Sequence, residues 1–144
     1  MRVMVLVKAN KDSEAGILPD QKIFEAMGKY NEELVKAGVM LAGEGLAPSS
    51  KGVRVKFSGE TRTVIPGPFP ETNQLLAGFW LWKVKSMDEA IEWLKRAPFG
   101  GGVEIELRPI MEFEDFGEQV PPELIEQEKR LRAQSEQIAK IAKK

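Results

Sequence analysis

The chain has 144 residues, of which 42% are hydrophobic and 30% charged, with 21 basic and 22 acidic residues. This composition is typical of one globular domain and argues against a disordered or fibrous chain. A net charge of −1 removes the main argument for nucleic acid or an anionic membrane as a partner.

The chain contains no cysteine and no histidine. These absences exclude a thiolate nucleophile, an imidazole base and any metal site built on those residues. Acid–base chemistry would have to use carboxylates, lysines or Tyr30, and we expect no metal and no cofactor. No stretch approaches the roughly 18–20 apolar residues of a membrane span, and segment 1–8 is too short for a signal peptide, so we expect a cytoplasmic protein.

In chain order, the N-terminal part predicts a strand, a helix and a second strand. Segment 2–8 is rich in β-branched residues and apolar on both faces, which is typical of a strand covered on both sides. The polar segment 10–19 predicts a loop. Apolar residues spaced by three or four predict a helix that starts at an N-cap, Asp20, and ends at Gly38. Segment 39–46 then predicts a bent strand.

The next segments predict a hairpin and a second strand–helix–strand unit. Segments 53–57 and 61–65 flank a short glycine-containing connection, which is typical of a β-hairpin. The three prolines of 66–70 predict a stiff loop. The remaining expected elements are a bulky strand at 78–84, a helix from the capping box at Ser86 to Pro98, a strand at 103–108 and a last helix at 121–144.

This order of elements predicts a ferredoxin-like α+β sandwich, in which the helices cover one sheet face only. We expect the other face to carry Met4 and Leu6, joined by Trp80 and Trp82, which makes it too apolar for contact with water. The sequence therefore predicts a homodimer through paired sheet faces, with a pocket between the two sheets.

The C-terminal helix has a narrow apolar seam of Leu124, Leu131 and Ile138, whose matching second positions are polar. This pattern favours a helix that packs on the domain or on the partner subunit over a coiled coil. The predicted domains are 1–118 for the ferredoxin-like part and 119–144 for this helix.

Seven segments follow one another in a recognisable order and spacing: SEAG at 13–16, GEGLAPSSKG at 43–52, GPFPET at 67–72, GFWLW at 78–82, EAIEW at 89–93, IELR at 105–108 and EDFG at 114–117. The set resembles the YCII-related, DGPF-type family of small bacterial proteins. The resemblance implies a dimeric α+β barrel built from ferredoxin-like units. It implies little about the reaction, although a few relatives resemble lyases or dehydrochlorinases that act on small aromatic or lactone substrates.

The chain departs from the family pattern at two positions. The aspartate of the DGPF motif is Pro66 here, and the lysine that usually follows Glu-Thr is Asn73. Some relatives use a His–Asp pair, and this chain has no histidine. A mechanism that needs those groups is therefore not supported by this sequence.

Glu44 lies between two glycines in an otherwise apolar strand. We expect a partly buried carboxylate with a raised pKa, which suits a general base near neutral pH. The alternative is that Glu44 caps a bulge or forms an ion pair.

Glu106 and Arg108 share one strand face with Glu104. Arg108 could hold an anionic substrate while Glu106 moves a proton. The alternative, which we favour, is a solvated strand face with ion pairs to Arg54 and Lys56.

Glu71 and Thr72 follow the proline-rich loop, which would hold them at the edge of a cleft as substrate-binding residues. Alternatively, they cap a short turn. Trp80 and Trp82 could form an aromatic floor for a flat ligand, although a place in the core or at the dimer interface is the commoner role.

Two functional hypotheses follow. The first is a homodimer that binds a small aromatic or anionic molecule. In that case Glu44 or Glu106 would be the base in lyase-type or isomerase-type proton transfer, and Arg54 or Arg108 would hold the anion. The alternative is a non-catalytic regulatory or protein-interaction module. A pocket that encloses a carboxylate favours the first, and a pocket filled by Trp and Phe side chains favours the second.

Overall fold

The computed structural model describes residues 1–142. The chain divides into two compact units, one spanning Met1–Ile110 and the other starting at Met111.

The first unit contains a four-stranded sheet, two long helices and a separate hairpin. Its strands are β1 (Arg2–Lys8), β2 (Met40–Gly45), β3 (Val53–Ser58), β4 (Thr61–Pro66), β5 (Leu76–Lys83) and β6 (Ile105–Pro109). Its helices are α1 (Lys11–Glu14), α2 (Gln21–Lys36) and α3 (Met87–Lys95), with short 3₁₀ turns η1 (Ser49–Lys51) and η2 (Thr72–Gln74).

The two long helices begin at the predicted caps. The Asp20 carboxylate accepts a hydrogen bond of 3.0 Å from the backbone N–H of Ile23, and Ser86 Oγ accepts one of 3.2 Å from the N–H of Glu89. Each bond satisfies a donor that the first helical turn leaves without a backbone partner. Gly38 follows α2 with a φ of 72°, the left-handed conformation that favours glycine at this position.

The expected loop at 10–19 is wrong for its first half, which forms helix α1. The side chain of Asn10 accepts a hydrogen bond of 2.8 Å from the N–H of Ser13, and the N–H of Asn10 donates one of 2.9 Å to Ser13 Oγ. This reciprocal pair is a capping box with serine in the place of the usual glutamate, so the sequence pattern did not reveal it.

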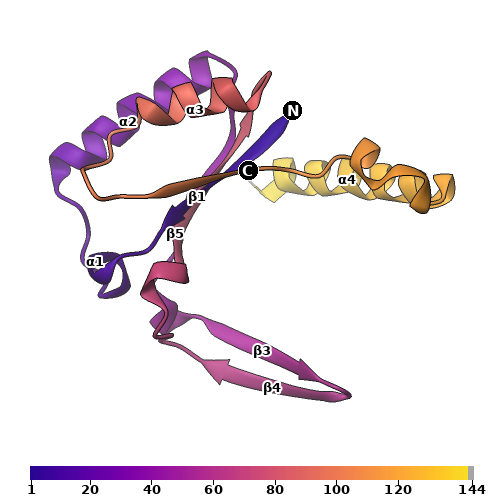
Figure 1. Ribbon diagram of the computed structural model, residues 1–144, viewed down its shortest axis with the longest axis horizontal. Coiled ribbons are helices and arrows are strands. Elements are labelled where there is room, and N and C mark those ends of the chain that lie inside the picture. The colour runs from indigo at the N-terminus through magenta and orange to yellow at the C-terminus, as the bar shows by residue number, and fades with distance from the viewer. Residues whose placement is uncertain (143–144) are drawn as a thin grey trace. The chain divides into compact units, whose positions relative to one another are not determined.

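The sheet is antiparallel, in the order β2-β5-β1-β6, which is consistent with a ferredoxin-like arrangement. Helices α2 and α3 cover one of its faces (Figure 1). The predicted α+β class is therefore confirmed, and the residues of the described chain form no closed barrel.

The core lies between the helices and one sheet face. Val3 is opposite Trp82 and Val5 is opposite Trp80, and residues directly opposite in an antiparallel pair point to the same face. All four are buried with Leu34 of α2. The expectation that the tryptophans join the uncovered face is wrong, because the register with β1 places them against the helices.

The uncovered face of the sheet carries half-buried apolar side chains, as predicted for Met4 and Leu6. Met4 is opposite Leu81 and Leu6 is opposite Phe79, so these four form the centre of the face. Charged residues lie on the same face around this apolar centre and include Glu44 on β2, Glu106 and Arg108 on β6, and Lys8 on β1.

The predicted hairpin is confirmed, with Gly59 at its turn in the left-handed region (φ 57°). Its two strands pair only with each other among the described strands, and each of their residues is exposed. The loops that lead to the hairpin leave the sheet at β2 and return to it at β5 (Figure 1).

The second unit contains η3 (Phe113–Gln119) and α4 (Pro122–Ala142). Arg132 of α4 lies over the ring of Phe113, with its guanidinium carbon 4.8 Å from the ring centroid. Its Nη1 is also 3.7 Å from a carboxylate oxygen of Glu112. No described residue of α4 is buried, and the predicted seam residues are exposed. The last two residues of the predicted helix lie outside the described residues.

The hydroxyl of Tyr30 links the two long helices, since it donates a hydrogen bond of 2.5 Å to the backbone carbonyl of Trp93. Replacing Tyr30 with Phe removes this bond and keeps the ring. We expect the free energy of unfolding to fall by about 1 kcal/mol at pH 7, measured by urea titration with tryptophan fluorescence.

The same substitution should change the alkaline limit of stability. Burial raises the pKa of Tyr30 from its ordinary 10.0 to about 12. Because the folded state binds this proton more tightly than the unfolded state, its contribution is complete below pH 10 and is lost as the pH rises toward 12. Tyr30→Phe should lack the loss of stability between pH 10 and pH 12 that titration of Tyr30 causes. If stability falls with pH in the variant as it does in the wild type, the raised pKa does not belong to Tyr30.

Candidate functional site

Three loops meet around the side chain of Glu14, at the end of α1. Its carboxylate accepts a hydrogen bond of 2.9 Å from the N–H of Ser49 and another from Ser49 Oγ. The N–H of Phe69, in the proline-rich loop, donates a bond of 3.0 Å to the same Oγ. Glu14 and Ser49 therefore join the first loop, the turn η1 and the proline-rich loop into one cluster, which we call the loop cluster.

Gly67 makes the close approach of two of these loops possible. Its N–H donates a bond of 2.9 Å to the carbonyl of Gly52. A Cβ at position 67 would lie 1.7 Å from the carbonyl oxygen of Ser49. This distance is too short for any side chain to be accommodated. Glycine is therefore required here by the packing of backbone against backbone.

Arg54 and Glu71, both predicted to bind substrate, are brought together beside the loop cluster. Arg54 Nη2 is 3.2 Å from a Glu71 carboxylate oxygen, and the guanidinium carbon lies 3.8 Å from the centroid of the Phe69 ring. The backbone N–H of Glu71 and the Arg54 guanidinium hold the pKa of this carboxyl below its usual range. The two charges neutralise each other, which favours a structural role for the pair in the single chain.

Thr72 is half-buried and begins η2. Its N–H donates a bond of 2.9 Å to the carbonyl of Pro70, and its own carbonyl accepts one of 3.3 Å from Leu75. These contacts correspond to the alternative of a short turn.

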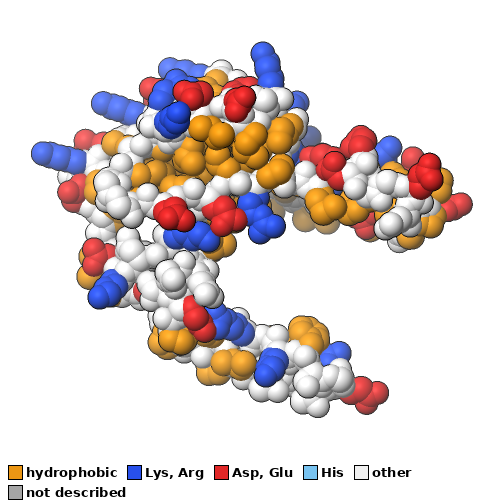
Figure 2. Space-filling view, in the orientation of Figure 1, with side chains coloured by type: hydrophobic (Ala, Val, Ile, Leu, Met, Phe, Trp, Pro, Cys, Tyr) orange, Lys and Arg blue, Asp and Glu red, His pale blue; other side chains and the backbone are white. Residues whose placement is uncertain are grey.

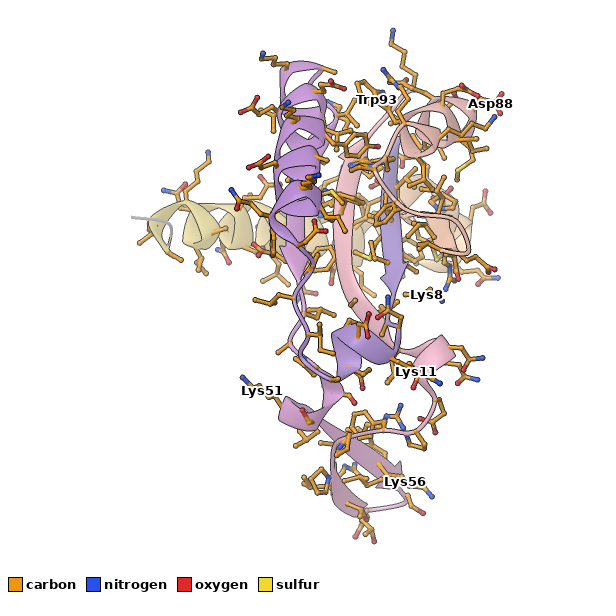
Figure 3. All side chains as sticks on the ribbon, turned by 90° about the vertical axis from the view of Figure 1, so that its left-hand side faces the viewer. Lys8, Lys11, Lys51, Lys56, Asp88 and Trp93 are labelled. Atoms are coloured by element: carbon orange, nitrogen blue, oxygen red, sulfur yellow. The ribbon has the colours of Figure 1, made fainter. Side chains whose placement is uncertain are left out.

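A cavity of about 740 Å³ adjoins the loop cluster. It lies between the segment that links α1 to α2, the helix α2 and the segment from β2 to η1, and its lining is mainly apolar. Lys51, on η1, is the cation among the lining residues, and it is labelled in Figure 3. The large apolar side chains that line it are Ile17, Leu18, Phe24, Met27 and Leu46.

The charge at this cavity is set by Glu14 and Lys51. The two hydrogen bonds from Ser49 hold the pKa of the Glu14 carboxyl below its usual range, so it is ionised at neutral pH. A carboxylate of this kind is a weak base, and its oxygens already accept bonds from Ser49. The Lys51 amine is therefore the group that can attract a charged ligand, and that ligand would be an anion.

The structure does not bring together the two predicted bases. Glu44, Phe79, Leu6 and Glu106 form one row across the four strands, so Glu44 and Glu106 lie at opposite edges, roughly 14 Å apart at ~4.8 Å per strand. Glu44 is exposed, and the expected burial is wrong because β2 is an edge strand.

Glu106 is half-buried and lies among cations. Its carboxylate oxygens are 3.3 Å from Lys8 Nζ and 3.7 Å from Arg108 Nε. Ion pairs do form on this strand, as the favoured alternative expects. Within the chain their cations are Lys8 and Arg108 and not Arg54 or Lys56, which lie on the separate hairpin sheet.

Trp80 is not on a ligand-binding floor of the open sheet face. Its indole N–H donates a bond of 3.0 Å to Asn31, and its ring meets the edge of Tyr30 at 5.8 Å between centroids. It does line a smaller cavity of about 270 Å³, together with Met27 and Phe99 on the helix side.

Sequence reasoning did not single out Glu14 and Ser49 as site residues. Both lie within the segments that carried the family resemblance, at 13–16 and 43–52. A serine and a glutamate are 35 positions apart here, and no local pattern connects them.

Comparison with known proteins gives the family of this chain. The family model described as "YCII-related domain" matches residues 1–114. The chain belongs to the YCII-related family. An uncharacterized protein of Rhizobium meliloti (strain 1021) is 28% identical to this YCII-related chain over 76 residues, which is 53% of the chain. The match spans 61% of that relative's length.

Two features that the described residues lack bear on the class of site. Within residues 1–142, no three carboxylates gather in a way that could hold a metal ion. Over the same range, no helix is long and apolar enough to cross a membrane.

Replacing Glu14 with Gln tests the loop cluster. Folding lowers the pKa of the Glu14 carboxyl. Its ionised form therefore stabilises the folded protein at any pH above the pKa of the unfolded state, and this stabilisation is lost as the pH falls through the pKa of the folded state. We expect Glu14→Gln to be less stable than the wild type at pH 7. The difference in melting temperature between Glu14→Gln and the wild type should shrink as the pH is lowered from 4.5. A constant difference across the acid range would contradict this role, and Glu25→Gln, on the exposed surface of α2, is the matched control.

Proposed function

We propose that this YCII-related chain binds a small, largely apolar molecule with an anionic group in the cavity beside the loop cluster. The observation that carries the proposal is the cavity itself, about 740 Å³ in volume, with apolar walls and Lys51 on its border. This volume lies in the range of pockets for small molecules, whose walls are mostly apolar with a few placed polar groups. The Lys51 amine would pair with the anionic end of the ligand.

Binding without catalysis is the better supported form of this function. Among residues 1–142 no charged side chain is buried, so the single chain offers no carboxylate of the kind expected of a tuned base. Glu44 lines the smaller cavity of about 270 Å³ but is exposed, and the Glu106 carboxylate is held by Lys8 and Arg108.

We also propose that the chain is a homodimer through that open face. Four half-buried apolar side chains, Met4, Leu6, Phe79 and Leu81, lie at its centre and are flanked by charges. Pairing two such faces would remove these side chains from water, at about 25 cal/mol for each Å² of apolar surface buried. It would also enclose Glu44 and Glu106 between the sheets.

A pair of matched probes tests the cavity. 1-Anilinonaphthalene-8-sulfonate carries an apolar ring system and a sulfonate, and N-phenyl-1-naphthylamine carries the same rings without the charge. We expect Lys51→Glu to weaken binding of the sulfonate by about fivefold to tenfold and to leave the neutral probe unchanged, since only the charge differs. Ala47→Phe, which adds a ring at the cavity wall, should weaken both.

The control for these titrations is Lys85→Glu, an exposed lysine that does not line the cavity. It should bind both probes like the wild type, as measured by calorimetry. If Lys51→Glu and Ala47→Phe also bind both probes like the wild type, the ligands occupy another surface and the proposed site is wrong.

Sedimentation tests the dimer. The wild-type chain should sediment at micromolar concentration with twice its mass of 16.1 kDa. Leu6→Glu places a charge at the centre of the open face and should give a monomer, because burial of an unpaired carboxylate is costly. Leu18→Glu, at an exposed position in the segment between α1 and α2, should remain a dimer. A wild-type monomer would refute the sheet-face interface.

A further inference from the structure

One face of the β3–β4 hairpin is mainly apolar and is exposed in the single chain. Val53 and Val55 of β3 share this face with Val64 of β4, because Val55 is opposite Val64. These side chains and that of Phe57 are 47–70% exposed. An isolated two-stranded hairpin is at best marginally stable in water. An apolar face on such an element indicates a partner that covers it.

Strand β6 has the matching pattern. It pairs only with β1 among the described strands, so its other edge is open. Ile105 and Leu107 face the helices and line a groove of about 440 Å³ beside α3, while Glu104 and Glu106 alternate with them. Figure 2 shows hydrophobic side chains gathered in the region of α3 and β6, with charged side chains along the border.

The backbone groups that could join the two strands point outward from each. The N–H of Ile110 donates to the carbonyl of Arg2, and hydrogen-bonded pairs alternate along an antiparallel ladder. Ile105 and Leu107 therefore direct their N–H and C=O groups to the open edge of β6.

Next to β3, the N–H of Gly67 donates a hydrogen bond to the carbonyl of Gly52, so these two residues form a hydrogen-bonded pair. Counting along the register from this pair, Val53, Val55 and Phe57 direct their backbone groups away from β4. Both strands thus present their apolar residues at the hydrogen-bonding positions of a free edge.

The charges between these apolar residues are opposite in sign. Strand β3 carries Arg54 and Lys56, and the β6 segment carries Glu104 and Glu106. No ion pair within residues 1–142 involves Lys56 or Glu104. Arg54 and Glu106 have other partners within the chain.

Within one chain, β3 and β6 do not pair. The hairpin is connected to β2 and β5, at one side of the sheet, whereas β6 is the opposite edge strand. The loops at the hairpin base are tied to the chain's own body through Ser49 and Glu14. If two sheets pair face to face with β2 of one above β6 of the other, the hairpin base of each copy lies near the acceptor strand of its partner.

We propose that β3 of one chain pairs antiparallel with β6 of a second chain, with Val55 opposite Ile105, and that the two copies exchange their hairpins in this way. This register places Lys56 opposite Glu104 and Arg54 opposite Glu106. A slip of two residues would instead place Arg54 opposite Arg108, with like charges in contact. The exchange rests on the homodimer proposed above and adds a second, edge-to-edge interface to it.

Engineered cysteines test the register, because the natural chain contains none. In the proposed pairing, positions 56 and 104 form a pair without mutual backbone hydrogen bonds, with Cα atoms about 4.5 Å apart, which suits a disulfide. Lys56→Cys and Glu104→Cys chains, mixed and oxidised, should give a linked heterodimer on a non-reducing gel. A mixture of Lys56→Cys with Glu25→Cys is the control and should link only at the rate of chance collision.

The double variant Lys56→Cys/Glu104→Cys separates exchange from folding back. Links between chains support the proposal, whereas links within one chain, or linking no faster than the control, overturn it. Both positions are exposed, so these substitutions should not disturb folding.

Charge reversal provides a second readout. Lys56→Glu should raise the dissociation constant of the dimer about tenfold, because two symmetry-related pairs become repulsive, and adding Glu104→Lys should restore it. A wild-type dimer that shows neither linking nor charge rescue would overturn the exchange and leave the sheet-face dimer standing. A chain that sediments as a monomer at every concentration would overturn both.

Discussion

The hydrogen bonds between Glu14 and Ser49 are the contact on which the arrangement of the loops depends. One carboxylate satisfies both the backbone N–H and the hydroxyl of Ser49, and that hydroxyl in turn accepts the N–H of Phe69. The three loops belong to distant parts of the sequence. The Glu14 side chain holds them together by hydrogen bonds, as backbone hydrogen bonds hold neighbouring strands together in a sheet. The cavity wall and the base of the hairpin are positioned by the same cluster.

The two faces of the sheet differ in what covers them. One face is closed by α2 and α3 over a core that includes Trp80 and Trp82. The other keeps four apolar side chains between charged edges and is the surface through which we propose dimerisation. Ligand binding is proposed at neither face, but in the loops at one end of the sheet.

Most local features of the fold were predictable from the sequence, whereas the register between distant strands was not. The caps at Asp20 and Ser86 act on their own helices, so the sequence predicted both starts. The alternation of β5 correctly separated Trp80 from Phe79, but which of them meets the helices depends on the register with β1. The glycines beside Glu44 suggested burial, whereas the position of β2 at the sheet edge leaves that carboxylate exposed.

The residues that give the protein its intrinsic fluorescence all lie in one of its two units. All three tryptophans and the single tyrosine lie in the first unit, at positions 80, 82, 93 and 30. Intrinsic fluorescence therefore reports the unfolding of the sheet and its helices and does not report the unfolding of α4. Far-ultraviolet circular dichroism, to which the 21 residues of α4 contribute strongly, follows both units. Melting curves from the two signals can thus separate the unfolding of the C-terminal helix from that of the core without any added label.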